Sequence, residues 1–203
     1  MATHPQPGSM SFEQYLILDQ NNPDVRYEYL DGQVRAMAGG TLDHSALGVR
    51  ICWLLSEALG IQGPCRVYNS DARVRIDAVN KCYRPDAVIT CDISNRGTAT
   101  IISSPHVVVE VLSPGTQGLD RGDKFRDYQL LPTLQEYVLI NYQVQLVEVY
   151  QREADRWTFR SYRAGEEIDL RSIDIQVAVD QLYAGIQIPA HLPESADKEN
   201  HNA

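Results

Sequence analysis

The segment VVVEVLS, residues 107–113, constrains the fold of this chain more than any other. Its apolar residues show no polar alternation, which predicts a strand covered on both faces. Glu110 stands at the centre of this run. An unpaired carboxylate there would cost on the order of several kcal/mol, the effective penalty for burying a lone ion. The segment therefore predicts a buried strand whose glutamate has a specific partner.

Composition fits one globular domain. The chain has 203 residues, of which 43% are hydrophobic and 22% are charged, enough to bury a core without staples. We expect a disordered lead over residues 1–10, a single domain over 11–188 and a disordered polar tail over 189–203. No apolar run approaches the roughly 18 residues of a membrane span, and the N-terminus does not resemble a secretory signal. We therefore expect a cytoplasmic protein without a membrane partner.

Charge and cysteine content exclude some classes of protein. The net charge of −9 argues against a protein that coats nucleic acid through bulk charge, although it leaves room for a local basic surface. The cysteines form no C-x-x-C pair, so zinc ligation and a disulfide framework are both disfavoured. We expect reduced thiols at all four positions: Cys52, Cys65, Cys82 and Cys91.

The order of predicted elements defines the fold class. Asp31-Gly32 between two strand-like runs predicts a hairpin over residues 26–37. Helices are expected at 11–19, 41–59 and 119–130, and strands at 71–77, 85–90, 106–112, 136–141, 144–150, 157–162 and 173–179. This order predicts an α/β or α+β domain in which helices flank a mixed central sheet.

Asp86 and Glu110 lie in consecutive predicted strands. If those strands are neighbours, both carboxylates reach the same side of the sheet, where they repel and one is pushed toward protonation. A divalent metal removes this conflict, and Mg²⁺ usually takes one or two carboxylates with water and substrate phosphate. Such a metal polarises a phosphoryl oxygen and activates water, so the pair favours phosphodiester hydrolysis.

A purely structural interpretation of the acidic pair stays open. Each carboxylate would then be satisfied by an arginine, and Arg84 is close enough in sequence to serve Asp86. This interpretation is harder for Glu110, because no lysine or arginine lies within ten residues on either side. The metal interpretation is therefore the stronger of the two.

Several motifs together resemble one known family. R-P-D at 84–86 and E-V-L at 110–112 resemble the PD-(D/E)XK restriction-endonuclease-like superfamily. The surroundings are similar to its bacterial Uma-type restriction endonuclease branch, over roughly residues 11–185, and imply a restriction-endonuclease-like fold. They comprise RYEYLDG at 26–32, His44, YRPD at 83–86, VVVEVLSPGT at 107–116 and D-x-x-x-K-x-x-x-Y at 120–128.

The resemblance implies a metal centre. The sequence departs from the superfamily pattern at one position. Mg²⁺, with Mn²⁺ as a substitute, would be held by Asp86, Glu110 and the carbonyl of Val111. Leu112 stands where the superfamily has a lysine. We expect Lys124, on the following helix, to place its ammonium where the ammonium of the superfamily lysine would lie. There it would orient the attacking water or help to deprotonate it.

Further side chains are candidates around this centre. By resemblance Glu28 would hold a water or a second metal, although a hairpin glutamate is far more often solvated. His44, in the first turn of a helix that disfavours its charged form, would bind a carboxylate or phosphate or be structural. Arg84 and Arg73 would contact phosphate or pair with acids. Tyr128, four residues after Lys124 as Asp120 is four before it, would orient that lysine or pack.

These expectations combine into a leading hypothesis, a Mg²⁺-dependent endonuclease that cuts DNA as a homodimer, since two sites are needed to cut two strands. The alternative is a non-catalytic protein that keeps the nuclease fold for nucleic-acid binding or assembly, favoured by the acidic charge and by Leu112. RNA or structured DNA remains open as a substrate. The terminal aromatics Tyr150, Trp157 and Phe159 are expected to pack a core or a subunit face.

Overall fold

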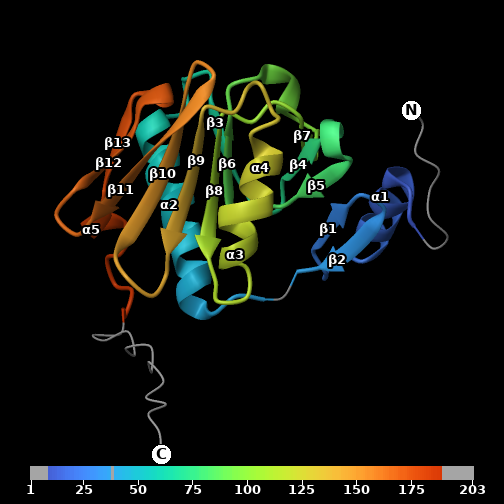
Figure 1. Cartoon of the computed structure of the whole chain (residues 1–203), viewed down its shortest axis with the longest axis horizontal. Coiled ribbons are helices and arrows are strands. Elements are labelled where there is room, and N and C mark those ends of the chain that lie inside the picture. Colours follow the sequence, from blue (N-terminus) through green and yellow to red (C-terminus); the bar gives the residue numbers. More distant parts are fainter. Residues whose placement is uncertain (1–8, 38, 189–203) are drawn as a thin grey trace, which may run out of the picture.

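A mixed six-stranded sheet forms the centre of the protein, whose computed structural model describes residues 9–37 and 39–188 (Figure 1). Strands β8 and β9 run parallel, and the other neighbouring strands of this sheet run antiparallel. In order across the sheet they are β11 (Arg156–Arg163), β10 (Leu146–Glu153), β9 (Glu136–Asn141), β8 (Val107–Leu112), β6 (Ala87–Thr90) and β3 (Arg66–Asn69). The predicted mixed fold class is confirmed.

Helices cover both faces of this sheet (Figure 1). Helix α2 (Leu42–Leu59) lies behind it, where its buried residues meet the alternate valines of β8. In front lies a continuous helix of three parts, namely α3 (Gln117–Leu119), a π-helical turn (Asp120–Lys124) and α4 (Phe125–Tyr128). Because every residue of β8 is buried, the two-sided burial predicted from VVVEVLS is confirmed.

The predicted N-terminal hairpin belongs to a second, five-stranded sheet. Asp31 and Gly32 form its turn with φ of 48° and 91°, a region that favours glycine. Helix α1 (Phe12–Asn21) packs against the hairpin, and its predicted Ser11–Gln14 capping box is present. The strands in order are β2 (Gln33–Ala36), β1 (Tyr27–Leu30), β5 (Lys81–Tyr83), β4 (Arg73–Ile76) and β7 (Ile101–Ile102).

A small third sheet lies beside α2, near the C-terminal end of the described residues. It pairs β12 (Glu167–Leu170) with β13 (Ile175–Ala178), and the short helix α5 (Val179–Leu182) follows. Residues 1–8 of the lead expected over 1–10, and the whole tail expected over 189–203, lie outside the described residues. Met10, at the end of that lead, donates its N–H to the Gly32 carbonyl. Over the described ranges, no helix is both long and apolar enough to cross a membrane.

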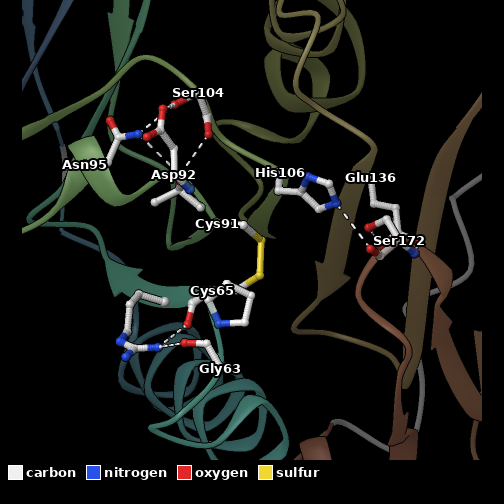
Figure 2. Close-up of a disulfide and its surroundings, with 12 residues drawn as sticks. Gly63, Cys65, Cys91, Asp92, Asn95, Ser104, His106, Glu136 and Ser172 are labelled. Carbon is white, nitrogen blue, oxygen red and sulfur yellow. Dashed lines mark hydrogen bonds between the residues drawn. A yellow bond between two sulfur atoms is a disulfide. The ribbon is translucent and has the colours of Figure 1, made fainter.

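The expectation of four reduced thiols is wrong for two cysteines. Cys65 and Cys91 form a disulfide (Figure 2), while Cys52 and Cys82 are free thiols. The reason lies in the pairing of β3 with β6, in which Arg66 stands opposite Thr90. One more step along this register brings Cys65 opposite Cys91. Strand β3 was absent from the sequence prediction, so nothing in the sequence brought these two cysteines together.

Candidate active site

The two strands that carry the acidic pair are neighbours. Strands β6 and β8 pair antiparallel with Ala87 opposite Val109, and one further step places Asp86 opposite Glu110. Asp86 Oδ2 accepts a hydrogen bond of 2.7 Å from the Val111 N–H. The condition for a shared acidic site, adjacency of the two strands, is therefore met.

Lys124 provides the buried cation that the sequence of β8 required. Its Nζ lies 3.2 Å from Glu110 Oε1, 3.3 Å from Glu28 Oε1 and 3.3 Å from Asp120 Oδ1. No more than 5% of any of these four side chains is exposed. We call this group the carboxylate–lysine cluster. It draws one residue from β1, one from β8 and two from the π-helical turn, so it exists only in the folded chain.

The π-helical turn sets the two helical members of the cluster. Asp120, Lys124 and Tyr128 follow one another at steps of four and are all buried. The Tyr137 hydroxyl donates to the Asp120 carbonyl at 2.9 Å, which ties this turn to β9. The Tyr128 hydroxyl donates to Glu110 Oε1 at 3.4 Å. π-Helical turns are rare and often occur at functional sites, and this one aims its charged side chains at the central sheet.

Asp120 is the member of the cluster that the sequence interpretation did not assign a role. Its Oδ1 is buried without a hydrogen-bond donor within range, apart from the ion-pair contact with Lys124. The signal was present in the sequence, because the D-x-x-x-K spacing places both residues on one helical face. The sequence does not show that this helical face packs against Glu110.

Burial and charge shift the pKa values in the cluster in definite directions. Burial raises the pKa of Glu110 well above its usual range, and the nearby Lys124 charge only partly opposes this shift. Burial lowers the pKa of Lys124, but Glu110, Glu28 and Asp120 together raise it well above its usual range. The three carboxyl groups thus favour the protonated form of Lys124, while burial favours the neutral form of Glu110.

Asp86 occupies the open side of this centre. Its side chain is 18% exposed, and burial raises its pKa while His44 and the Val111 N–H oppose the shift. His44 Nε2 donates to the Val111 carbonyl at 2.8 Å and lies 3.8 Å from Asp86 Oδ2. The backbone of Val111 is therefore held on both sides of its Cα, by Asp86 at the N–H and by His44 at the carbonyl.

The two arginines that were expected to contact phosphate or to pair with acids take the second role, away from the cluster. Arg84 and Arg73 are buried, and both direct their guanidinium groups to Asp19 at 2.7–2.8 Å. Only the backbone N–H of Arg84 reaches the cluster, where it donates to Glu28 Oε1 at 3.4 Å. The Arg84 side chain instead lines a separate cavity of about 380 Å³ with Asp19, Pro23, Asp24, Val25, Arg26 and Asp71.

The donor set suits a hard divalent cation. Both hydrogen bonds to Glu110 fall on Oε1 and the one to Asp86 falls on Oδ2. Among the described residues, no three or more His, Cys, Asp and Glu side chains form a ready metal-binding group. Mg²⁺ does not need one, since it commonly takes one or two carboxylates and completes its shell with water and phosphate. Asp86, Glu110 and the Val111 carbonyl fit that requirement.

Fold and site together define the class: an α+β protein of nuclease-like fold with an acidic pair and a buried lysine. The chain belongs to the Uma2 family, because the family model described as "Putative restriction endonuclease" matches residues 12–180. The resemblance inferred from the motifs is confirmed.

The chain is also similar to two proteins of Synechocystis sp. and to a solved structure. It is 37% identical over 178 residues to "Uncharacterized protein slr1290" of Synechocystis sp., covering 87% of this chain and 93% of the relative. It is 28% identical to "Uncharacterized protein sll1609" of the same organism, covering 70% and 81% of the two chains. A crystal structure titled as a "putative nuclease belonging to DUF820" from Anabaena variabilis has the same fold, with a TM-score of 0.69 at 17% identity. That match covers 86% of this chain and 97% of the other.

Proposed function

We propose that this protein is a metal-dependent endonuclease that hydrolyses phosphodiester bonds in DNA. The observation that supports this most is the carboxylate–lysine cluster beside Asp86, where several buried carboxyl groups lie together. Burial raises the pKa of Asp86 and of Glu110, and a divalent cation would stabilise their charged forms. Membership of the Uma2 family agrees with the activity. Mg²⁺, with Mn²⁺ as a substitute, would be held by Asp86, Glu110 and the Val111 carbonyl.

The bound metal would polarise the phosphoryl oxygen and lower the pKa of an attacking water. The protein's own residues divide the remaining work. Asp86 and Glu110 would hold the cation, and the hydrogen bond from the Val111 N–H to Asp86 fixes the position of Asp86 relative to Val111. His44 shares the Val111 carbonyl, so metal binding at that oxygen requires His44 to release it or share it.

Lys124 has an electrostatic role in this mechanism. Of the two roles that the family pattern suggests, water orientation and proton abstraction, its raised pKa supports only the first, because a general base must be unprotonated. Glu28 and Asp120 act through Lys124 as positioning residues, since each holds the ammonium at 3.3 Å. A fixed positive charge of this kind stabilises charge that develops on the phosphate.

Cleavage of supercoiled plasmid tests the proposal. Wild-type protein with Mg²⁺ or Mn²⁺ is expected to nick plasmid, and Asp86→Asn and Glu110→Gln are expected to abolish nicking while keeping side-chain size. Asp92→Asn serves as a matched control, because Asp92 is an exposed helix cap that follows β6, whereas Asp86 precedes β6, so the length of the strand separates them. Equal cutting by wild type and both site variants would show that the site is wrongly assigned.

A non-catalytic role is the second candidate. Leu112 is 2% exposed within an apolar cluster at the position of the superfamily lysine, and the Lys124 charge is already neutralised inside the protein. Both features would suit a protein that keeps the fold for nucleic-acid binding or assembly. Titration calorimetry separates the two candidates: no heat with millimolar Mg²⁺ or Mn²⁺, together with no cleavage, leaves only the non-catalytic role.

The proposal also covers the substrate, the oligomeric state and the location of the protein. The substrate is DNA, the active form is a homodimer because two strands require two sites, and the location is the cytoplasm. The Cys65–Cys91 disulfide makes the last point testable, because the cytosol keeps most thiols reduced. Labelling of free thiols in rapidly quenched cells would report whether this pair is oxidised.

A further inference from the structure

Strand β11 is the edge of the central sheet and has an unusual composition for this chain. Its eight residues, RWTFRSYR, contain three arginines and three aromatic residues but no acid, whereas the chain as a whole has a net charge of −9. Basic and aromatic residues together on one strand are typical of surfaces that bind single-stranded nucleic acid. Whether β11 can bind such a ligand depends on which of its side chains face outward.

The two faces of β11 differ. Tyr162 is buried in the core beneath α2, so the alternate residues Phe159, Ser161 and Arg163 point to the opposite face, which carries α3 and α4. We call these three residues the edge ledge. All three are exposed, and Phe159 keeps 55% of its surface accessible. Its ring lies 5.1 Å from Tyr150, which holds it in place at the rim of an aromatic cluster.

The edge ledge lies on the same face of the sheet as the carboxylate–lysine cluster. The strand register aligns Glu110 with Leu139, Leu139 with Glu148 and Glu148 with Ser161. Three strand spacings separate the first and last of these residues, about 14 Å in total. Arg121, on the π-helical turn, pairs with Glu148 at 2.7 Å and lies along this row. One bound strand of several nucleotides can span such a distance.

The ledge has positive charge available for a ligand. Within the described part of the chain, Arg163, the arginine of the ledge, forms no ion pair with a carboxylate within 4 Å. Glu166 is nearby, but it accepts from the backbone N–H of Arg163 at 2.6 Å. A phosphate is the anion expected to complement such an arginine.

The other possible occupant, a second copy of β11, is disfavoured by charge. If two copies paired antiparallel about the centre of the strand, Arg156 of each would face Arg163 of the other. Like charges directly opposite destabilise a strand pair, and charged residues commonly protect edges from such pairing. The edge therefore suits an anionic ligand better than a copy of itself.

We propose that the edge ledge binds a single-stranded polynucleotide, with a base stacked on Phe159 and a phosphate bound by Arg163. This inference rests on the proposed nuclease function and extends it, because it assigns the site a preference for strands with unpaired bases. Only an unpaired base presents its face to an aromatic ring. Tyr150 and Trp157 pack as the sequence predicted, whereas Phe159 is largely exposed.

Fluorescence anisotropy in EDTA tests the ledge without cleavage, using labelled single-stranded DNA, single-stranded RNA and duplex DNA of one sequence. Wild type is expected to bind the single strands more tightly than the duplex. Phe159→Ala is expected to weaken single-strand binding by about fivefold or more, and Phe159→Trp to retain it. Arg163→Gln is expected to lower the slope of log affinity against log salt by about 0.7. Arg96→Gln, beside β3 at the opposite edge of the central sheet, removes the same charge and is expected to change neither value.

Each contrary outcome is distinct. If wild type nicks plasmid while Phe159→Ala and Arg163→Gln bind like wild type, the ledge proposal is wrong and the nuclease proposal stands. If these variants instead convert a dimer to a monomer in light scattering with unchanged affinity, the edge is a subunit interface and the proposal is also overturned. If wild type binds no single strand but takes up Mn²⁺ and nicks duplex DNA, only the ledge proposal fails. If wild type neither binds single strands, nor takes up Mn²⁺, nor nicks duplex DNA, both proposals are overturned.

Discussion

Lys124 Nζ lies 3.2 Å from Glu110 Oε1, so the glutamate inside β8 receives its cation from the π-helical turn that crosses the sheet. The same ammonium contacts Glu28 and Asp120 at 3.3 Å. A single lysine thus serves as the hub for three carboxylates drawn from distant parts of the sequence. The stability of the fold and the proposed chemistry both depend on this lysine. Unfolding and cleavage measurements on substituted proteins follow the two properties separately.

Removal of the Lys124 ammonium is expected to destabilise the fold strongly. Lys124→Met keeps most of the side-chain volume but leaves buried carboxylates without their cation, a change that costs about 3–5 kcal/mol for buried pairs. Lys81→Met is the matched control, since Lys81 pairs with Asp127 at 2.7 Å with 25% of its side chain exposed. Its loss is expected to cost about 1 kcal/mol. Urea unfolding measures both, and equal losses would contradict the hub.

A second substitution is expected to relieve part of that penalty. In the Lys124→Met background, Glu28→Gln removes one of the carboxylates left without a cation. The double variant is expected to be more stable than Lys124→Met alone, whereas Glu28→Gln in the wild-type background is expected to be destabilising. A double-mutant cycle gives the coupling energy between the two positions. A coupling near zero would mean that Glu28 and Lys124 do not interact.

The raised pKa of Glu110 predicts a specific pH dependence in the absence of divalent metal. The folded state holds this proton more tightly than the unfolded state, so Glu110 contributes stability that is present below about pH 4.3. That contribution is lost as pH rises through the raised pKa of the folded state. Glu110→Gln is expected to remove the loss, so its stability relative to wild type improves with rising pH. Unfolding in EDTA at several pH values measures it, and parallel profiles would refute it.

Leu112→Lys tests whether the departure from the superfamily pattern is compensated. Leu112 is 2% exposed in an apolar cluster, and Lys124 already provides an ammonium to Glu110. A second lysine is therefore expected to lower the free energy of unfolding by several kcal/mol, roughly the cost of burying an unpaired charge, without increasing cleavage. Leu112→Met provides the volume-matched control and is expected to cost about 1.5 kcal/mol or less. A stable and more active lysine variant would show that the site had lost a needed group.

The disulfide predicts a stabilisation that depends on redox conditions. Cys65 and Cys91 are separated by 26 residues, and closing a loop of that size stabilises a protein by about 3 kcal/mol in the chain-entropy account. Reductant is expected to lower the melting temperature of wild type and to leave that of a Cys65→Ser/Cys91→Ser double variant unchanged. Thermal unfolding with and without reductant measures this, and an equal response of both proteins would exclude the disulfide as the cause.

Much of the fold was predictable because local signals were strong. The apolar run at 107–113 indicated burial on both faces, and Asp31-Gly32 indicated the hairpin turn. Strands β3, β5, β7 and β12 were missed because they span only two to four residues, too few to show a clear pattern. The error over Cys65 and Cys91 followed directly, since their pairing depends on β3.

The candidate site was predictable in composition but not in its contacts. Asp86 and Glu110 were linked by strand order, and Lys124 by its helical spacing from the family motif. The depth of Glu28, 4% exposed, was not foreseeable from a hairpin sequence, because burial there depends on the π-helical turn packing over it. Arg84 and Arg73 looked available for phosphate because their partner Asp19 lies at the end of α1, far away in sequence.

Mn²⁺ titration calorimetry of wild type and Asp86→Asn, with Asp92→Asn as the control, tests the central claim most directly. Asparagine can still accept the Val111 hydrogen bond, so the fold should persist while a charged ligand is lost. The account predicts that wild type and Asp92→Asn bind Mn²⁺ alike and that Asp86→Asn binds it at least about tenfold more weakly. Equal binding by all three proteins, or binding by none, would contradict a metal centre at Asp86 and Glu110.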